Sequence, residues 1–145
     1  MFCDDGSGEI ADYITIEERN QVCYVTFYHC KASAARQPGN RVADLYEVCG
    51  QAVKSGSWLQ PERLLDRLGH RAAFPSIRGF AKGDEAEAAR LLGGAEFRRG
   101  VQFEINIVQP GVQRDGRAAD ISSLLASARH YLVQGAVDKF GVIGS

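Results

Sequence analysis

The sequence lacks the features of membrane and secreted proteins. No apolar run approaches the roughly 20 residues that a membrane-spanning helix requires. The first 20 residues are rich in Asp and Glu, whereas a secretory signal peptide begins with basic residues. We therefore expect a cytoplasmic protein that does not engage a membrane.

Cysteine is scarce, and the two signs of charge nearly balance. The four cysteines, at positions 3, 23, 30 and 49, include no Cys-x-x-Cys pair of the kind that zinc sites use. A chain of 145 residues also buries enough apolar surface to fold without disulfides, so we interpret the cysteines as reduced and mostly buried. The formal net charge of −1 excludes a uniformly basic nucleic-acid coat protein but allows a local basic patch.

Common catalytic signatures are absent as well. The sequence has no Gly-x-Ser-x-Gly nucleophile elbow, and the segment 79–83 lacks the spacing of a nucleotide-binding loop. His29 and Cys30 are adjacent, so on a strand they point to opposite faces and form a poor nucleophile–base pair. These absences disfavour hydrolases with a Ser or Cys nucleophile and nucleotide-binding proteins.

The composition and patterning that are present indicate a globular domain. Hydrophobic residues make up 45% and charged residues 24% of the chain. Alternating apolar positions and β-branched or aromatic residues predict strands at 10–16, 22–31, 101–108 and 140–143. The polar residues 17–20 then connect the first two strands.

Helical spacing predicts four helices, at about 42–54, 61–69, 84–92 and from residue 120 onward, with Asp84 and Asp120 as caps of the last two. The first of them has an apolar stripe and a polar row. The stripe consists of Val42, Leu45, Tyr46, Cys49, Ala52 and Val53, and the polar row of Asp44, Glu47, Gln51 and Lys54. The apolar stripe of the last helix consists of Ile121, Leu124, Leu125, Ala128, Tyr131 and Leu132.

The order of these elements predicts a mixed α/β (α+β) fold, with a central mixed sheet of about four to five strands flanked by helices. The chain contains no internal repeat, low-complexity tract or long linker. We therefore expect residues 1–145 to form a single domain.

The polar residues of the two early strands carry a resemblance. The run Glu9-Ile10-Ala11-Asp12-Tyr13-Ile14, the run Tyr28-His29-Cys30-Lys31 and the later Gln51 on a helix follow one another in order. This first third of the chain resembles the PD-(D/E)XK restriction-endonuclease-like superfamily. That superfamily has an aspartate on its second core strand, an acid-x-lysine motif on the third, and often a glutamine on the following helix.

The resemblance implies a restriction-endonuclease-like sheet and a metal-dependent nuclease that hydrolyses DNA. Asp12 would then be the principal ligand of Mg²⁺, Lys31 would offset charge on the phosphate, and Gln51 would position water or a phosphate. Such a metal lowers the pKa of its water and acts as a Lewis acid. A lysine beside it stabilises charge that develops in the transition state.

This chain departs from the superfamily pattern at His29, which stands where the motif has Asp or Glu. Imidazole is a poorer ligand for Mg²⁺ than carboxylate and suits Mn²⁺ or Zn²⁺ better. Three interpretations follow: the acid has migrated to Glu9 or Glu47, the site binds a softer metal through His29, or catalysis has been lost. The last would leave a catalytically degenerate domain that binds DNA or protein.

A second resemblance concerns the context of the domain. The run Tyr46-Glu47-Val48-Cys49-Gly50-Gln51-Ala52 and the run Ile107-Val108-Gln109-Pro110-Gly111 resemble the terminal region of bacterial helicase-linked defence proteins. The superfamily also has a helix before its first strand, for which this chain has no room. We therefore expect a domain excised from a longer chain, with DNA or RNA and a covalently linked or associated helicase-type domain as partners. The superfamily and the sheet edges also allow a homodimer.

Basic side chains between residues 61 and 100 supply a second candidate surface. Arg63, Arg67 and Arg71 recur at helical spacing, and Arg78 and Lys82 follow. These five residues predict contacts with nucleic-acid phosphates, provided that the helix continues beyond residue 69.

Each candidate residue also has a structural interpretation. Asp12 can satisfy turn amides at a strand start, and Lys31 can lie in solvent at a strand end. His29 can be a hydrogen-bonded core residue, and Glu47 and Gln51 can belong to a solvated helix face. The arginines can belong to an ordinary charged surface. A carboxylate among isoleucines is nonetheless costly without a partner, and this favours a functional Asp12.

Overall fold

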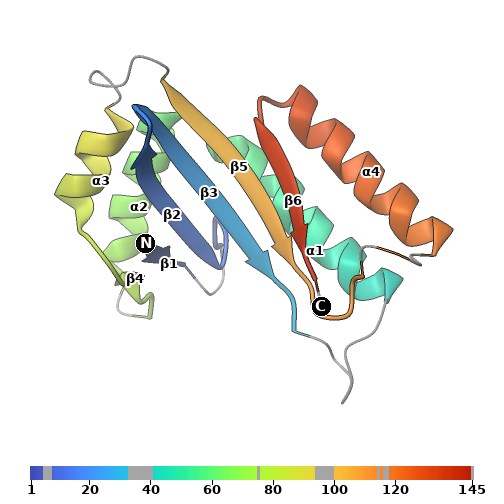
Figure 1. Ribbon diagram of the computed structural model, residues 1–145. Coiled ribbons are helices and arrows are strands. Elements are labelled where there is room, and N and C mark those ends of the chain that lie inside the picture. The colour runs from blue at the N-terminus through green and yellow to red at the C-terminus, as the bar shows by residue number, and fades with distance from the viewer. Residues whose placement is uncertain are drawn as a thin grey trace.

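The computed structural model describes residues 1–4, 8–32, 41–74, 76–93, 100–113, 115 and 118–144. Within these residues the chain forms six strands and four α-helices (Figure 1). The strands are β1 (Phe2–Cys3), β2 (Tyr13–Arg19), β3 (Val22–Cys30), β4 (Gly79–Phe80), β5 (Val101–Val108) and β6 (Lys139–Ile143). The helices are α1 (Val42–Ser55), α2 (Pro61–Ala72), α3 (Glu85–Leu92) and α4 (Ala119–Gln134), with a short 3₁₀ helix, η1, at Gly56–Trp58.

All six strands belong to one mixed sheet in the order β4-β1-β2-β3-β5-β6. The pairs β4–β1, β1–β2 and β2–β3 are antiparallel, whereas β3–β5 and β5–β6 are parallel. The carboxyl ends of β3, β5 and β6 therefore lie at one end of the sheet. Because β2 runs against β3, with Tyr13 opposite Tyr28, the start of β2 lies at this same end. The mixed α/β class is confirmed, with slightly more strands than expected.

The hairpin between β2 and β3 is tighter than the sequence suggested. Asn20 and Gln21 both have positive φ, 53° and 60°, as the two central residues of a type I′ turn require. The polar residues 17–19 consequently continue β2, with exposed side chains, instead of forming the connection. The polar side chains of residues 17–19 indicate exposure to solvent and do not indicate the end of the strand.

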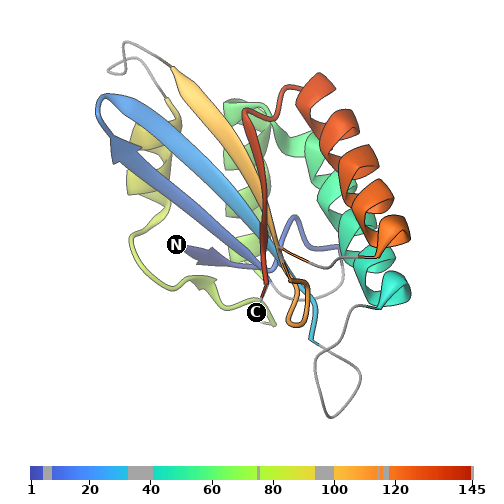
Figure 2. The ribbon, with the colours of Figure 1, turned by 45° about the vertical axis from the view of Figure 1, so that its right-hand side comes forward.

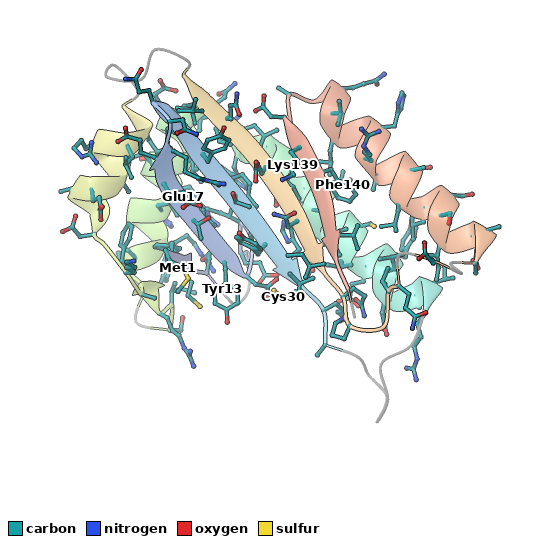
Figure 3. All side chains as sticks on the ribbon, in the orientation of Figure 1. Met1, Tyr13, Glu17, Cys30, Lys139 and Phe140 are labelled. Atoms are coloured by element: carbon teal, nitrogen blue, oxygen red, sulfur yellow. The ribbon has the colours of Figure 1, made fainter. Side chains whose placement is uncertain are left out.

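The core lies between one face of the sheet and the helices. The buried face includes Ile14, Val25, Phe27, Ile105 and Ile107. Helix α1 packs on β3 and β5, α3 on β2, and α4 on β6, so the helices gather on one side of the strands (Figure 2). The opposite face carries residues such as Tyr13, Cys30 and Lys139 (Figure 3). Among the described residues, no helix is long and apolar enough to cross a membrane.

The apolar stripes of two helices are narrower than expected. Helical spacing predicts Tyr46 and Tyr131 in these stripes, yet 70% and 61% of their surfaces are exposed, and Val42 is exposed as well. The residues that α1 buries are Leu45, Val48, Cys49, Ala52 and Ser55. Only one side of each helix packs against the sheet, so residues at the margin of its apolar stripe face solvent.

Two helix boundaries differ from expectation and one agrees. Helix α2 continues past Gly69 to Ala72, with Ala73 as its C-cap. Gly69 does not end the helix, and a Cβ added there would meet only the carboxylate end of the flexible Glu85 side chain on α3. Asp120 lies in the first turn of α4 and not at its cap, which is Ala118, whereas Asp84 caps α3 by accepting a hydrogen bond from the Glu87 amide (2.8 Å).

Candidate active site

Asp12 lies immediately before β2, where this strand begins beside the end of β3. Its Oδ2 accepts a hydrogen bond of 2.7 Å from the backbone N–H of Cys30. The next amide along the chain, that of Lys31, donates to the carbonyl of Val108 on β5 (3.0 Å). The half-buried carboxylate of Asp12 is thus attached to the end of the central strand rather than to a local turn.

Lys31 follows β3 and forms an ion pair with Glu47 of α1, with Nζ 2.7 Å from Oε1. The hydrogen bond that Lys31 donates to Glu47 raises the pKa of Lys31, and the negative charges of Asp44 and Asp12 act in the same direction. Lys31 is therefore a charged ammonium near neutral pH. It can stabilise an anion, but it cannot serve as a general base.

Two residues of the polar row of α1, Glu47 and Gln51, lie at this end of the sheet. Glu47 and Gln51 lie one turn apart, and Gln51 Nε2 donates to Oε1 of Glu9 over 3.3 Å. Three parts of the chain therefore contribute to one region. The segment before β2 contributes Glu9 and Asp12, the end of β3 contributes Lys31, and helix α1 contributes Glu47 and Gln51. We call this group of five residues the polar cluster.

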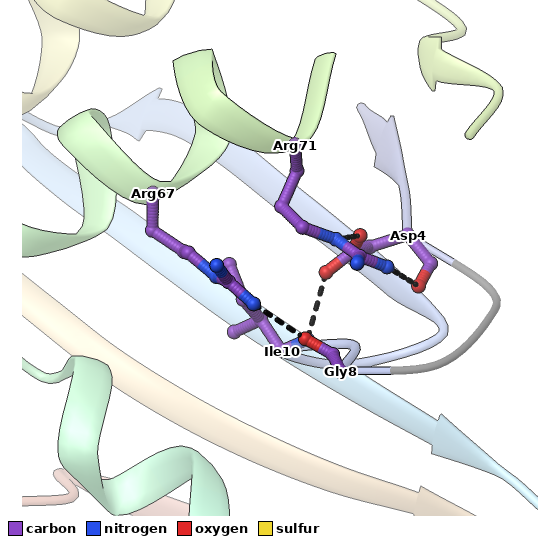
Figure 4. A network of polar contacts seen from close by, with 5 residues as sticks. All are labelled: Asp4, Gly8, Ile10, Arg67 and Arg71. Carbon is purple, nitrogen blue, oxygen red and sulfur yellow. Dashed lines mark hydrogen bonds and ion pairs between the residues drawn. The ribbon is translucent and has the colours of Figure 1, made fainter. Parts of the chain in front are cut away.

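A buried network holds the segment that carries Glu9 and Asp12 (Figure 4). The Ile10 N–H donates to Oδ2 of Asp4 (2.7 Å), and the Asp4 N–H donates to the carbonyl of Asp12 (3.1 Å). Asp4 is fully buried and pairs with Arg71 of α2, which is itself only 6% exposed. Arg71, expected to contact phosphates, thus lies in the core as the counterion of Asp4.

His29 lies on the helix-covered face of β3 and is 1% exposed. Its Nε2 is 2.8 Å from the hydroxyl oxygen of Ser55, the last residue of α1. Burial lowers the pKa of His29 to about 4, so the ring is neutral at physiological pH. Ser55 was not anticipated from the sequence, although a histidine on an apolar strand face already demanded a buried polar partner.

This histidine predicts a loss of stability in mild acid. Its pKa is lower in the folded state, about 4, than the usual 6.5, so below pH 6.5 the unfolded chain takes up a proton that the folded chain excludes. The contribution of the neutral His29 ring to the free energy of unfolding is fully present above pH 6.5. About 3 kcal/mol of the free energy of unfolding is lost as the pH falls from 6.5 to 4. Urea denaturation of the wild type and of His29→Gln across this range measures the effect. Equal pH slopes in the two proteins would contradict the assignment.

The donor set determines which metal fits the polar cluster. Among the described residues, no three His, Cys, Asp or Glu side chains lie together as a ready metal site. A zinc centre needs three or four such ligands. Mg²⁺ instead uses one or two carboxylates and completes its shell with water and phosphate oxygens. Glu9 and Asp12 lie three residues apart in one segment and are carboxylates, the type of side-chain ligand that Mg²⁺ uses.

The arginines of α2 divide between two surroundings. The guanidinium groups of Arg63 and Arg67 lie over the ring of Trp58, at 5.7 and 5.4 Å from its centre. Arg67 also donates to the carbonyl of Gly8 (2.8 Å), next to Glu9. Arg78 and Lys82 are exposed on either side of β4, which forms the edge of the sheet opposite β6. Trp58 was not predicted as a site residue. The sequence signal for it is that the single tryptophan of the chain lies just before the arginines.

Comparison with protein-family models, with curated proteins and with solved structures gave no match. The interpretation of the polar cluster therefore depends on its own chemistry.

Proposed function

We propose that this domain is a metal-dependent nuclease that hydrolyses DNA phosphodiester bonds, as part of a larger nucleic-acid-processing or defence protein with a helicase-type partner. One observation carries the proposal. Asp12 is anchored on the Cys30 amide at the end of β3, and the next residue along that strand is the charged Lys31. An anchored carboxylate and a cation at the end of one strand suit a site for a metal and a phosphate, and Glu9 is a second carboxylate on the segment that carries Asp12.

Each member of the polar cluster has a distinct role in this proposal. A bound Mg²⁺ or Mn²⁺ would lower the pKa of a water molecule and offset the charge of the phosphate. Asp12 and Glu9 would hold the metal, and the amide of Gln51 would orient Glu9. Lys31 would stabilise the negative charge that develops on the phosphate. Glu47 keeps the Lys31 ammonium in place until a phosphate competes for it.

Trp58, Arg63 and Arg67 would guide the nucleic acid toward this site. The contact of Arg67 with the Gly8 carbonyl places a guanidinium beside the segment that carries Glu9 and Asp12. Among the described residues, neither Arg63 nor Arg67 has an ion pair with a carboxylate. Two adjacent guanidinium groups without acidic partners are suited to phosphate oxygens. Arg78 and Lys82 would extend the contact along the far edge of the sheet.

The alternative function is a degenerate nuclease-like domain that binds DNA or protein without cutting it. Two observations favour it: no three metal-ligating side chains are preassembled among the described residues, and His29 is engaged with Ser55. The two functions share the fold and the basic surface and differ in catalysis.

The test is cleavage of supercoiled plasmid and of single-stranded DNA by the purified chain with Mg²⁺, with Mn²⁺ and with excess EDTA. The proposal predicts cleavage that requires a metal and stops with EDTA. DNA retention in a mobility-shift assay without cleavage under either metal would support the degenerate domain. A folded protein that neither binds nor cuts either substrate would overturn the nuclease function and the DNA-binding form of the alternative.

Lys31→Met is expected to lower the cleavage rate by about 100-fold, because the charge that stabilises the transition state is lost. The rate at saturating DNA measures this effect, and DNA affinity should change much less. Lys139→Met, which removes an exposed lysine of β6, is the matched control and should cut like the wild type. A Lys31→Met protein with an unchanged rate would remove Lys31 from the mechanism.

A further inference from the structure

We propose that Ser55 and His29 are positioning residues of the polar cluster: together they hold the carbonyl of Ile10 and thereby fix Glu9 and Asp12 relative to helix α1. This inference rests on the proposed function, since it assigns the two residues a role in metal binding and catalysis. Neither side chain would touch the metal or the DNA.

The hydrogen-bond directions follow from the geometry. The Ser55 hydroxyl lies 2.6 Å from the carbonyl oxygen of Ile10 and 3.3 Å from that of Gln51, and both can only accept, so its single proton is donated to the closer oxygen, that of Ile10. The Ser55 oxygen is then the acceptor for Nε2 of His29, at 2.8 Å. His29 must therefore carry its proton on Nε2. Its Nδ1, which has no partner among the described residues, is left as an acceptor rather than as an unsatisfied donor.

The two peptide groups that flank Ile10 are consequently each held by a hydrogen bond. Asp4 accepts its N–H at 2.7 Å, and Ser55 donates to its carbonyl at 2.6 Å. Ile10 is 2% exposed, so water has little access to either bond. Glu9 precedes this residue and Asp12 lies two positions after it. The orientation of these two peptide groups therefore sets where both carboxylates project.

Helix α1 joins this support to the rest of the cluster. Ser55 lies one turn after Gln51, which bonds Glu9, and two turns after Glu47, which bonds Lys31. One helix thus holds the carboxylate of Glu9 and the backbone beside it. On this account the histidine at the position of the superfamily's acid ties β3 to α1 and is not a ligand. Partners that orient ligands in this way typically change metal affinity or activity about 10- to 100-fold when removed.

The test compares Ser55→Ala with Ser57→Ala, an exposed serine of η1 as control. Ser55→Ala should lower the rate at saturating DNA about 10-fold and weaken Mn²⁺ binding about 10-fold, with little change in the KM for DNA. Free Mn²⁺ measured by electron paramagnetic resonance gives the affinity without any turnover. His29→Gln, which keeps a donor near the Nε2 position, should retain more activity than His29→Leu. A folded Ser55→Ala protein with wild-type rate and Mn²⁺ affinity would overturn the inference.

A second measurement needs neither activity nor a variant. Nitrogen-15 NMR of the wild-type histidines at neutral pH should show His29 with its proton on Nε2. A proton on Nδ1, or a charged ring, would overturn the inference even if the variants fail to fold.

If the wild type neither cuts DNA nor binds Mn²⁺, the proposed function fails. Faster amide exchange at Ile10 in Ser55→Ala than in Ser57→Ala would then still show that Ser55 holds this segment.

Discussion

Arg71→Met is expected to lower the free energy of unfolding by about 3–5 kcal/mol. Asp4 is fully buried, and its charge is balanced by Arg71 at the core end of α2. Methionine fills much of the space of the arginine but leaves the carboxylate of Asp4 buried without a counterion. Urea denaturation at neutral pH measures the loss as a lower transition midpoint with an unchanged slope.

Two further variants separate the ion pair from general effects of substitution in α2. Arg63→Met removes an exposed arginine two turns earlier and should cost no more than about 1 kcal/mol, the value of its contact with Trp58. Adding Asp4→Asn to Arg71→Met should restore part of the loss, since no charge is then buried alone and the amide oxygen still accepts from Ile10. An Arg71→Met protein as stable as Arg63→Met would contradict the buried pair.

Asp12→Asn is expected to reduce DNA cleavage about 1,000-fold, which corresponds to about 4 kcal/mol of transition-state stabilisation. The asparagine oxygen can still accept from the Cys30 amide, so the local structure is kept while the negative charge is removed. Single-turnover rates measure the loss, and fluorescence anisotropy with labelled DNA shows whether binding is preserved. A loss below 10-fold in a folded protein would exclude Asp12 as the main metal ligand.

The long regular elements could be predicted because their patterns reflect burial directly. Strand β5 has the predicted bounds, and its alternate residues Phe103, Ile105 and Ile107 are buried. The two-residue strands β1 and β4 were not predicted, because two residues are too few to show alternation. Their formation depends on pairing between Phe2 and Phe80, which are distant in the sequence.

The candidate site could be predicted in part, for a similar reason. Helical spacing put Glu47 and Gln51 on one face, and the structure turns that face toward Lys31 and Glu9. The surroundings of Arg71 and His29 could not be predicted in this way. An arginine at helical spacing looks the same whether it faces solvent or a buried Asp4. Only the tertiary packing of α2 against the chain start, and of Ser55 against β3, decides between these environments.

The most direct test of the nuclease proposal is metal-dependent plasmid cleavage by three proteins purified in parallel: the wild type, Asp12→Asn and Asp138→Asn. Asp138 is a matched control, since its carboxylate also accepts a hydrogen bond from a strand amide, that of Phe103 at 2.8 Å. It lies near the start of β5, at the other end of the sheet from Asp12. We expect the wild type and Asp138→Asn to cut plasmid with Mg²⁺ or Mn²⁺ and Asp12→Asn to leave it intact. Equal cleavage by all three would indicate a contaminant or another site, and a wild type without activity under either metal would contradict the nuclease function.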